Sequence, residues 1–188
     1  MPLSTFSASV CVFCGSRPGL RASYETAATE TGEMLARQGW RLVYGAGDVG
    51  LMGSVARAAQ GAGGASFGVI PRHLVEAETG KTDLDTYVVT ETMHERKKVM
   101  FMNADAIVML PGGAGSLDEF FEVLTWRQLG LHDKPILLLD IDGYWQPLRQ
   151  LINHVIDEGF ANDSLKSFIH YVSSVKALEK ALAETLLA

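Results

Sequence analysis

Short, uninterrupted apolar runs recur along this chain, and longer stretches with helical spacing of apolar residues separate them. Val, Ile, Leu and Phe fill these runs without the polar alternation of a half-buried strand, which is typical of strands covered on both faces. We expect strands at residues 10–14, 41–44, 66–70, 87–90, 106–110, 136–139 and 169–172, and helices at 22–38, 51–60, 93–103, 117–129, 144–158 and 175–187. This alternation predicts a doubly wound α/β fold with a mainly parallel sheet of about seven strands flanked by helices.

The length of 188 residues is close to that of one domain, so we expect a single α/β domain over residues 1–188, with residues 1–8 as a loose lead-in. No stretch reaches the roughly 18 consecutive apolar residues that a membrane span requires. The N-terminal segment "MPLSTFSASV" lacks the basic and long apolar parts of a secretory signal. We therefore expect a cytoplasmic protein that does not bind a membrane.

The net charge of −6, from 22 acidic and 16 basic residues, argues against a nucleic-acid-binding surface but permits a local pocket for a small anion. Cys11 and Cys14 form a C-x-x-C within the first expected strand, where their three-residue offset directs the thiols to opposite faces. No second Cys or His pair supplies further ligands. We expect buried thiols and no metal site.

Glycine-rich loops follow three of the expected strands, where ligands of doubly wound folds bind. The loops are "CGSRPG" after the first strand, "YGAGDVGLMG" after the second and "PGGAGS" after the fifth. Glycine allows close approach of the backbone to a ligand, and amides at a following helix N-terminus can bind phosphate. Glycine in a single loop of this kind is common, but three such loops at one edge indicate a nucleotide pocket.

A dinucleotide-binding site is the main alternative, because Gly45, Gly47 and Gly50 match G-x-G-x-x-G between a strand and a helix. That fingerprint normally occupies the first βαβ unit, and the next strand then carries an acidic residue for the ribose. Here "PRH" follows the next strand. An NAD(P)-dependent oxidoreductase therefore remains open as an alternative with weaker support.

A run of cations begins the helix expected before the fifth strand, in "TETMHERKK". Thr92 and Glu95 have the spacing of a capping box. Arg96, Lys97 and Lys98 follow directly, where the helix dipole disfavours positive charge by roughly 0.3–1 kcal/mol each. A bound phosphate would offset this, and helical geometry lets at most two of the three cations face it, for which we select Arg96 and Lys97. A solvated charge run is the alternative.

Ser116 and Glu119, in "GSLDE", also have the spacing of a capping box, so Glu119 could simply cap its helix. If Glu119 instead faces a ligand, the helix dipole favours its ionised form. An ionised carboxylate is suited to stabilising a developing positive charge or activating water, rather than to donating a proton.

The stretches "VYGAGDVGLMG", "MHERK" and "PGGAGSLDEFFEVLTWRQLGLHDKPILLLDIDGYWQPL" resemble the LOG family (Lonely Guy), cytokinin riboside 5′-monophosphate phosphoribohydrolases that are often mislabelled lysine decarboxylases. The resemblance covers residues 10–172, and the combination of PGGxG(T/S)xxE with MHxRK is highly specific. Three departures are mild: Ser116 replaces the usual Thr, Asp118 the common Glu, and Ala46 interrupts a frequent GGG.

The resemblance implies a Rossmann-like fold, a homodimer with sites near the interface, no cofactor and no metal. It also implies hydrolysis of AMP or an N6-substituted AMP to free base and ribose 5-phosphate. Arg96 and Glu119 fall on the family's catalytic pair. The residues expected to bind substrate or its phosphate are Gly15, Ser16, Gly45, Gly47, Met93, Lys97, Gly112, Gly113, Ala114, Gly115 and Ser116.

Several functional points stay open in the sequence. A non-catalytic nucleotide or cofactor carrier could use the same scaffold. The donor of a proton to the leaving base is not identified, although Asp48 is one candidate. The polar segment 71–85, "PRHLVEAETGKTDLD", is either a flap over the site or an ordinary loop. A lysine decarboxylase is disfavoured, because no feature supports a pyridoxal site around Lys97.

Overall fold

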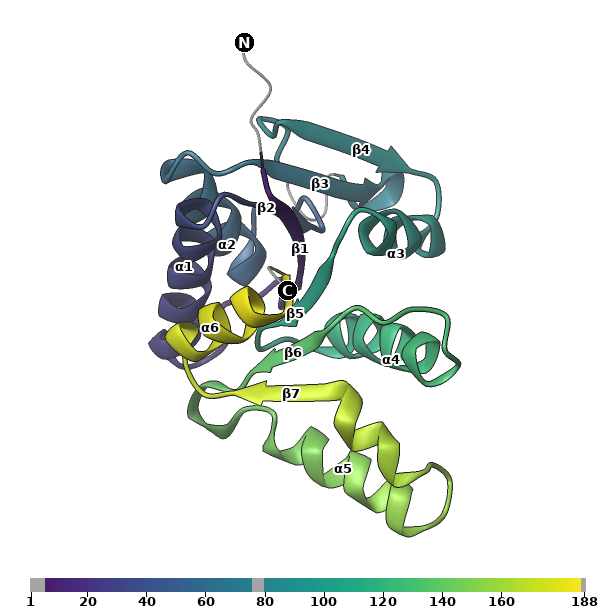
Figure 1. The fold of residues 1–188 in the computed structure, drawn as a ribbon. Helices are drawn as coiled ribbons and strands as arrows, with labels where there is room; N and C mark the ends of the chain where they lie inside the picture. The colour runs from purple at the N-terminus through teal and green to yellow at the C-terminus, as the bar shows by residue number, and fades with distance from the viewer. Residues whose placement is uncertain (1–5, 76–79, 187–188) are drawn as a thin grey trace.

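The computed structural model of the chain describes residues 6–75 and 80–186. In this part of the chain the strands are β1 (Ala8–Phe13), β2 (Trp40–Tyr44), β3 (Ser66–Pro71), β4 (Thr86–Thr90), β5 (Ala106–Met109), β6 (Ile136–Leu139) and β7 (Ile169–Val172). They form one seven-stranded sheet in the order β4-β3-β2-β1-β5-β6-β7, and all neighbouring pairs are parallel. The predicted Rossmann-like α/β fold is confirmed (Figure 1).

The strand order reverses between β1 and β5, since the chain builds the sheet outward from β1 to β4 and then returns to place β5 on the other side of β1. Phe13 pairs with Met109 at the carboxyl ends of these two strands. The loops that follow β1 and β5 therefore start side by side. In open α/β sheets such a reversal opens a crevice in which ligands bind.

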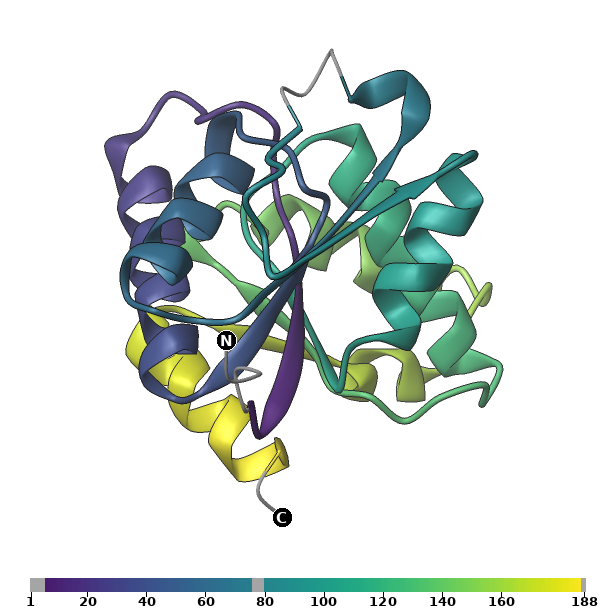
Figure 2. The same ribbon diagram turned by 90° about the horizontal axis from the view of Figure 1, so that it is seen from above.

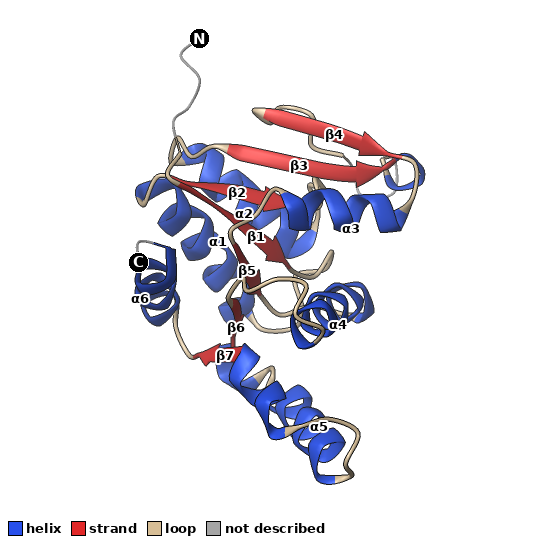
Figure 3. Cartoon of the chain, turned by 45° about the vertical axis from the view of Figure 1, so that its right-hand side comes forward, coloured by secondary structure: helices blue, strands red, loops and turns tan. Residues whose placement is uncertain are grey.

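The helices form a layer on each face of the sheet. They are α1 (Ala22–Arg37), α2 (Gly50–Gly61), α3 (Met93–Met102), α4 (Ala114–Gln128), α5 (Gln146–Asp157) and α6 (Val175–Leu186), with short 3-10 helices η1 (Arg72–Leu74), η2 (Ile141–Gly143) and η3 (Asp163–Phe168). Figures 1 and 2 show α1, α2 and α6 on one side of the sheet and α3 and α4 on the other, and Figure 3 shows α5 beside the β7 edge.

The sheet separates two apolar cores, which explains why its strands are apolar without alternation. Val10 and Val12 of β1 belong to the core under α1, α2 and α6, whereas Cys11 and Phe13 belong to the core under α3, α4 and α5. Cys11 and Cys14 are both buried and belong to opposite cores, as their spacing predicts. Burial raises the pKa of the Cys11 thiol well above its ordinary value, so this thiol is held in its neutral form.

The element boundaries differ from the sequence expectation at two places that matter. Ala8 is already a buried residue of β1, where it pairs with Trp40, so it belongs to the sheet and not to a loose lead-in. Helix α4 begins at Ala114, three residues before the expected start at residue 117, because the glycines of "PGGAGS" do not prevent helical geometry. Residues 1–5, 76–79 and 187–188 lie outside the described residues.

The polar segment 71–85 is only partly within the described structure. Its first part forms η1, and its last part returns to the β2–α2 loop, where Gly80 forms a bridge with Gly47 and the Lys81 amide donates to the Ala46 carbonyl. Among the described helices, none is long and apolar enough to cross a lipid bilayer.

Candidate active site

A cavity of about 490 Å³ opens at the carboxyl edge of the sheet, at the reversal point between β1 and β5. This volume is within the range of small-molecule sites. The described residues that line it come from the loops after β1, β2 and β5, from α3 and α4, and from the segment after β6. Of the expected site residues, the cavity brings together Gly15, Ser16, Gly45, Met93, Arg96, Gly112, Gly113, Ala114, Gly115, Ser116 and Glu119.

The N-terminus of α4 faces this cavity. Gly113 occupies the N-cap position with extended backbone, and no side chain of the described residues caps the helix. The first amide groups of a helix have no partner within it, so those of α4 are available to an anion. Gly113 and Gly115 leave open space where a Cβ would lie.

The capping-box interpretation of Ser116 and Glu119 is wrong, because α4 begins before Ser116 and the N-cap residue is Gly113. Ser116 is a buried residue of the first turn. Glu119 lies in the second turn and lines the cavity. The helix dipole acts mainly within the first turn, so it stabilises the Glu119 carboxylate less than the sequence suggested.

Close packing of the loops requires glycine at two positions. A Cβ on Gly112 would lie 2.1 Å from Ser116 Oγ and 3.0 Å from the Gly15 nitrogen. A Cβ on Gly45 would lie 2.1 Å from a terminal nitrogen of Arg96 and 3.2 Å from Met52 Sδ. Glycine therefore lets the loop after β5 approach that after β1, and lets Arg96 lie against the end of β2.

Arg96 is a buried cation in the wall of the cavity, with 4% of its surface exposed. Its Nε donates to the Val69 carbonyl at 3.1 Å, and Nη2 donates to the Gly45 carbonyl at 2.8 Å. These bonds tie α3 to the ends of β2 and β3, so the guanidinium is held in a fixed position. These two backbone carbonyls offset part of the positive charge that Arg96 places near the start of α3.

Lys97 lies elsewhere than the sequence suggested. The residues that line the cavity do not include it, and its Nζ forms ion pairs with Asp118 at 2.9 Å and Glu122 at 2.8 Å. Burial would lower the pKa of Lys97, but hydrogen bonds to the two carboxylates outweigh this effect and raise it. The geometry favours a structural link between α3 and α4 over a phosphate contact for Lys97.

The capping box at the start of α3 is confirmed. Thr92 Oγ1 accepts a hydrogen bond from the Glu95 amide, and the Glu95 carboxylate accepts one from the Thr92 amide. The box fixes the first turn of α3, which carries Met93 and Arg96 into the cavity wall.

The loop after β2 is only partly used by the cavity. Gly45 lines it, whereas Gly47 pairs with Gly80 and lies outside the lining residues. Asp48, considered as a proton donor, also lies outside them and forms an ion pair with Arg57. The geometry therefore gives no support to Asp48 as the donor to a leaving base.

Sequence reasoning missed several residues that line the cavity. Tyr144 is the most informative, because its hydroxyl donates to the Gly112 carbonyl at 2.5 Å. It follows β6 and η2, and a search of every strand end could have found it. Arg17 lies in the loop after β1, and Met52 and Leu74 add apolar surface. In the described part of the chain, no group of three or more His, Cys, Asp or Glu side chains could hold a metal ion.

Comparison with solved structures supports the fold. The molybdenum cofactor carrier protein MCP from Chlamydomonas reinhardtii superposes with a TM-score of 0.73 at 22% identity, covering 96% of this chain and 99% of that one. A molybdenum cofactor binding protein from the bacterium Rippkaea orientalis gives 0.71 at 20% identity, covering 96% and 98%. At such identities the similarity concerns the fold alone.

Sequence comparison is more specific. A family model described as "Possible lysine decarboxylase" matches residues 52–182. Cytokinin riboside 5′-monophosphate phosphoribohydrolase LOG3 of Arabidopsis thaliana is 43% identical over 176 residues, which are 93% of this chain and 81% of that protein. The probable phosphoribohydrolase LOGL5 of Oryza sativa subsp. japonica is 45% identical over 160 residues, or 85% and 65% of the two chains. The chain therefore belongs to the LOG family.

Proposed function

We propose that the protein hydrolyses the N-glycosidic bond of nucleoside 5′-monophosphates, cytokinin riboside 5′-monophosphates above all, to free base and ribose 5-phosphate. One observation carries this proposal: Glu119 and Arg96 line the same cavity as the uncapped N-terminus of α4. A carboxylate and an anion-binding helix end in one cavity match a substrate that becomes cationic at its sugar and is anionic at its phosphate. Curated LOG relatives with 41–45% identity carry the name of this activity.

The phosphate binds at the start of α4 in this proposal. Gly113, Ala114 and Gly115 present the first amide groups of the helix, and the loop after β1 lies against them, since the Gly15 amide donates to the Pro111 carbonyl at 3.0 Å. Arg17, an exposed cation of that loop, also lines the cavity. We assign to Arg17 the contact with the phosphate charge that the sequence analysis gave to Lys97.

The sheet order then sets the direction of the nucleotide. The phosphate site lies over β1 and β5, and Gly45 at the end of β2 lies on the far side of β1. Beyond it, Met52, Leu74 and Met93 provide apolar surface. The base lies toward these side chains, and methionine adapts its shape well enough to accommodate an apolar N6 substituent.

The reaction breaks the bond between C1′ and the base nitrogen, and the electron pair leaves with the base. Positive charge then spreads over C1′ and the ring oxygen, and the Glu119 carboxylate stabilises it. Water attacks C1′ and loses a proton to Glu119, while the departing base takes up a proton. Arg96, held by two backbone carbonyls, orients the reacting groups. Binding of the phosphate at a distance from C1′ positions the ribose for this step.

A release assay tests the proposal. Purified protein is incubated with AMP and N6-isopentenyl-AMP, and free base and ribose 5-phosphate are quantified by chromatography. Equimolar release of both products is expected, with the matching nucleosides reacting far more slowly because they lack the phosphate. Binding of AMP without release would support a carrier instead, and equal turnover of nucleosides would contradict the phosphate site. A nicotinamide absorbance change with NAD(P) would indicate the oxidoreductase alternative.

We also propose that two copies associate along α3 and α4, which lie on the same side of the sheet (Figure 3). Residues near the N-terminal ends of both helices line the cavity. The C-terminal ends of the two helices are in contact, since the Phe101 ring lies 4.9 Å from that of Trp126. Met102, Leu129 and Leu131 at these ends are each about two-thirds exposed. Exposed apolar side chains gathered in one region indicate an association surface. A partner docked along both helices would lie close to the active site.

A further inference from the structure

Three successive backbone carbonyls of the loop after β5, those of Pro111, Gly112 and Gly113, have donors within the protein. The Pro111 carbonyl accepts from the Gly15 amide at 3.0 Å, and the Gly113 carbonyl accepts from the Leu117 amide at 3.0 Å inside α4. Between them, the Gly112 carbonyl accepts from the Tyr144 hydroxyl at 2.5 Å. A carbonyl oxygen turned into the cavity would repel an anion, so the direction of these groups decides whether the loop can bind one.

The Gly112 carbonyl is the one whose donor is a side chain from a distant part of the chain. In a trans peptide the carbonyl and the amide hydrogen point in opposite directions. The Gly112 carbonyl and the Gly113 amide belong to the same peptide group. A hydrogen bond that holds the carbonyl toward Tyr144 therefore holds the Gly113 amide in the opposite direction. Because Gly112 and Gly113 are glycines, no side chain restricts rotation of this peptide, and an external hold is needed.

Tyr144 is itself well fixed. Its ring makes edge-to-face contacts with Tyr24 of α1 at 5.5 Å and with Trp145 at 4.8 Å between centroids. The preceding turn is attached to α1 as well, since Ser23 Oγ donates to Asp142 Oδ2 at 2.6 Å. The hydroxyl is thus presented to the loop by an aromatic group packed on a different layer of the fold.

We propose that Tyr144 is a positioning residue that orients the Gly112–Gly113 peptide so that its amide faces the substrate phosphate. The inference rests on the phosphate site of the proposed function, but not on hydrolysis. Tyr144 acts through the loop and takes no part in bond cleavage. Loss of its hydroxyl frees the peptide to rotate and weakens recognition of the phosphate, while the base and the reacting carbon keep their contacts.

The test is Tyr144→Phe, which keeps the aromatic packing and removes only the hydroxyl. Tyr171→Phe is the matched control, because the buried Tyr171 hydroxyl has no hydrogen-bond partner among the described residues and lies outside the cavity lining. Binding of AMP and adenosine is measured by calorimetry, KM and kcat by base release, and folding by thermal melting.

For Tyr144→Phe we expect the Kd and KM for AMP to rise about tenfold, as loss of one hydrogen bond to an oriented group implies. The value of kcat should change less than twofold, adenosine affinity should not change, and Tyr171→Phe should match the unsubstituted protein. An unchanged Kd for AMP would overturn the proposal, as would an equal loss of AMP and adenosine affinity. Failure of the unsubstituted protein to bind AMP would also overturn it. Binding of AMP without base release would contradict only the hydrolase proposal.

Discussion

Glu119 carries the proposed chemistry at the scale of single residues. Glu119→Gln keeps the size and shape of the side chain but removes the charge that stabilises the cationic sugar. We expect kcat for base release to fall by about 10²–10³-fold, a typical loss when one electrostatic contact to a transition state is removed. The Kd for AMP, measured by calorimetry, should change only a few-fold. A variant with full turnover would exclude Glu119 from the reaction, and equal loss of helicity and activity would indicate a structural role.

Lys97 should affect stability more than substrate binding. Its Nζ contacts Asp118 and Glu122, and only 7% of its side chain is exposed. Lys97→Met leaves the partly buried Glu122 carboxylate without its cation, so we expect the free energy of unfolding in urea to fall by about 1–3 kcal/mol. The KM for AMP should stay within about twofold of its original value. A large rise in KM with unchanged stability would instead restore Lys97 to the phosphate site.

The sequence could predict the positions of some site residues better than those of others. Gly112, Gly113 and Glu119 line the cavity because their motif follows directly on a strand, and a parallel sheet brings such positions to one edge. The partner of Lys97 could not be predicted, since it depends on how α3 packs on α4. Tyr144 could have been listed as a residue that follows a strand end, but its hydrogen bond to Gly112 could not be predicted, because it joins residues 32 positions apart in the chain.

At the scale of elements, the start of α4 makes different demands on its glycines. A Cβ on Gly112 would overlap Ser116 Oγ, whereas Gly115 has open space at that position. We expect Gly112→Ala to lower the free energy of unfolding by about 1–3 kcal/mol through overpacking. Gly115→Ala should leave it unchanged or raise it by up to roughly 1 kcal/mol, because alanine favours the helix. Urea denaturation of both variants decides this, and equal stability of the two would contradict the packing.

The loop that joins α4 to β6 should be sensitive to pH through His132. Burial lowers the pKa of His132, and its ring nitrogens face the Val123 carbonyl and the Lys134 amide, as a neutral imidazole requires. The unfolded chain binds a proton at this residue near pH 6.5, but the folded chain does so only at lower pH. The free energy of unfolding should therefore decrease as the pH falls below about 6.5.

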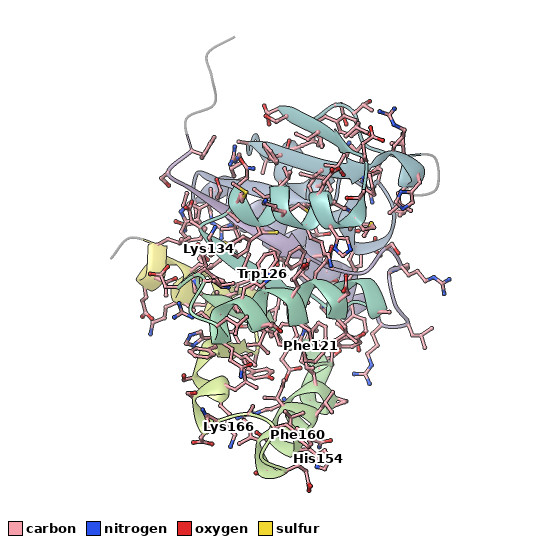
Figure 4. All side chains as sticks on the ribbon, turned by 90° about the vertical axis from the view of Figure 1, so that its right-hand side faces the viewer. Phe121, Trp126, Lys134, His154, Phe160 and Lys166 are labelled. Atoms are coloured by element: carbon pink, nitrogen blue, oxygen red, sulfur yellow. The ribbon has the colours of Figure 1, made fainter. Side chains whose placement is uncertain are left out.

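Thermal melting at pH 7.5, 6.5 and 5.5 tests this dependence. We expect His132→Asn to have a lower Tm than the original protein at pH 7.5, because its hydrogen bonds are lost, but a smaller fall of Tm toward pH 5.5. His154→Asn serves for comparison, since it makes the same substitution at an exposed position of α5 (Figure 4). An equally steep fall in His132→Asn would assign the effect to other groups.

At the scale of the whole molecule, the fold was predictable because local and global signals agree. The apolar runs of the inner strands are buried on both faces, the edge strands β4 and β7 are only partly buried, and among the described elements an α-helix follows every strand except β3, which is followed by the short η1. The strand order could not be predicted from the pattern of apolar runs. Strand β5 pairs with β1 rather than with β4, and this choice depends on which strand edge is free once β1 to β4 have paired. This return creates the crevice between β1 and β5, so the position of the cavity followed from topology and not from the motifs alone.

Association of two chains is the last expectation at this scale. Met102, Leu129 and Leu131 expose apolar surface at the ends of α3 and α4, so we expect light scattering to give twice the chain mass of 20.4 kDa. Combining Leu129→Asp and Leu131→Asp places two charges in the proposed interface and should yield monomers with unchanged helicity. Phe160→Asp is the control, because Phe160 is also a highly exposed apolar side chain but lies at the far end of α5 (Figure 4). A dimer that survives the double substitution would place the interface on another face, and a monomeric original protein would exclude it.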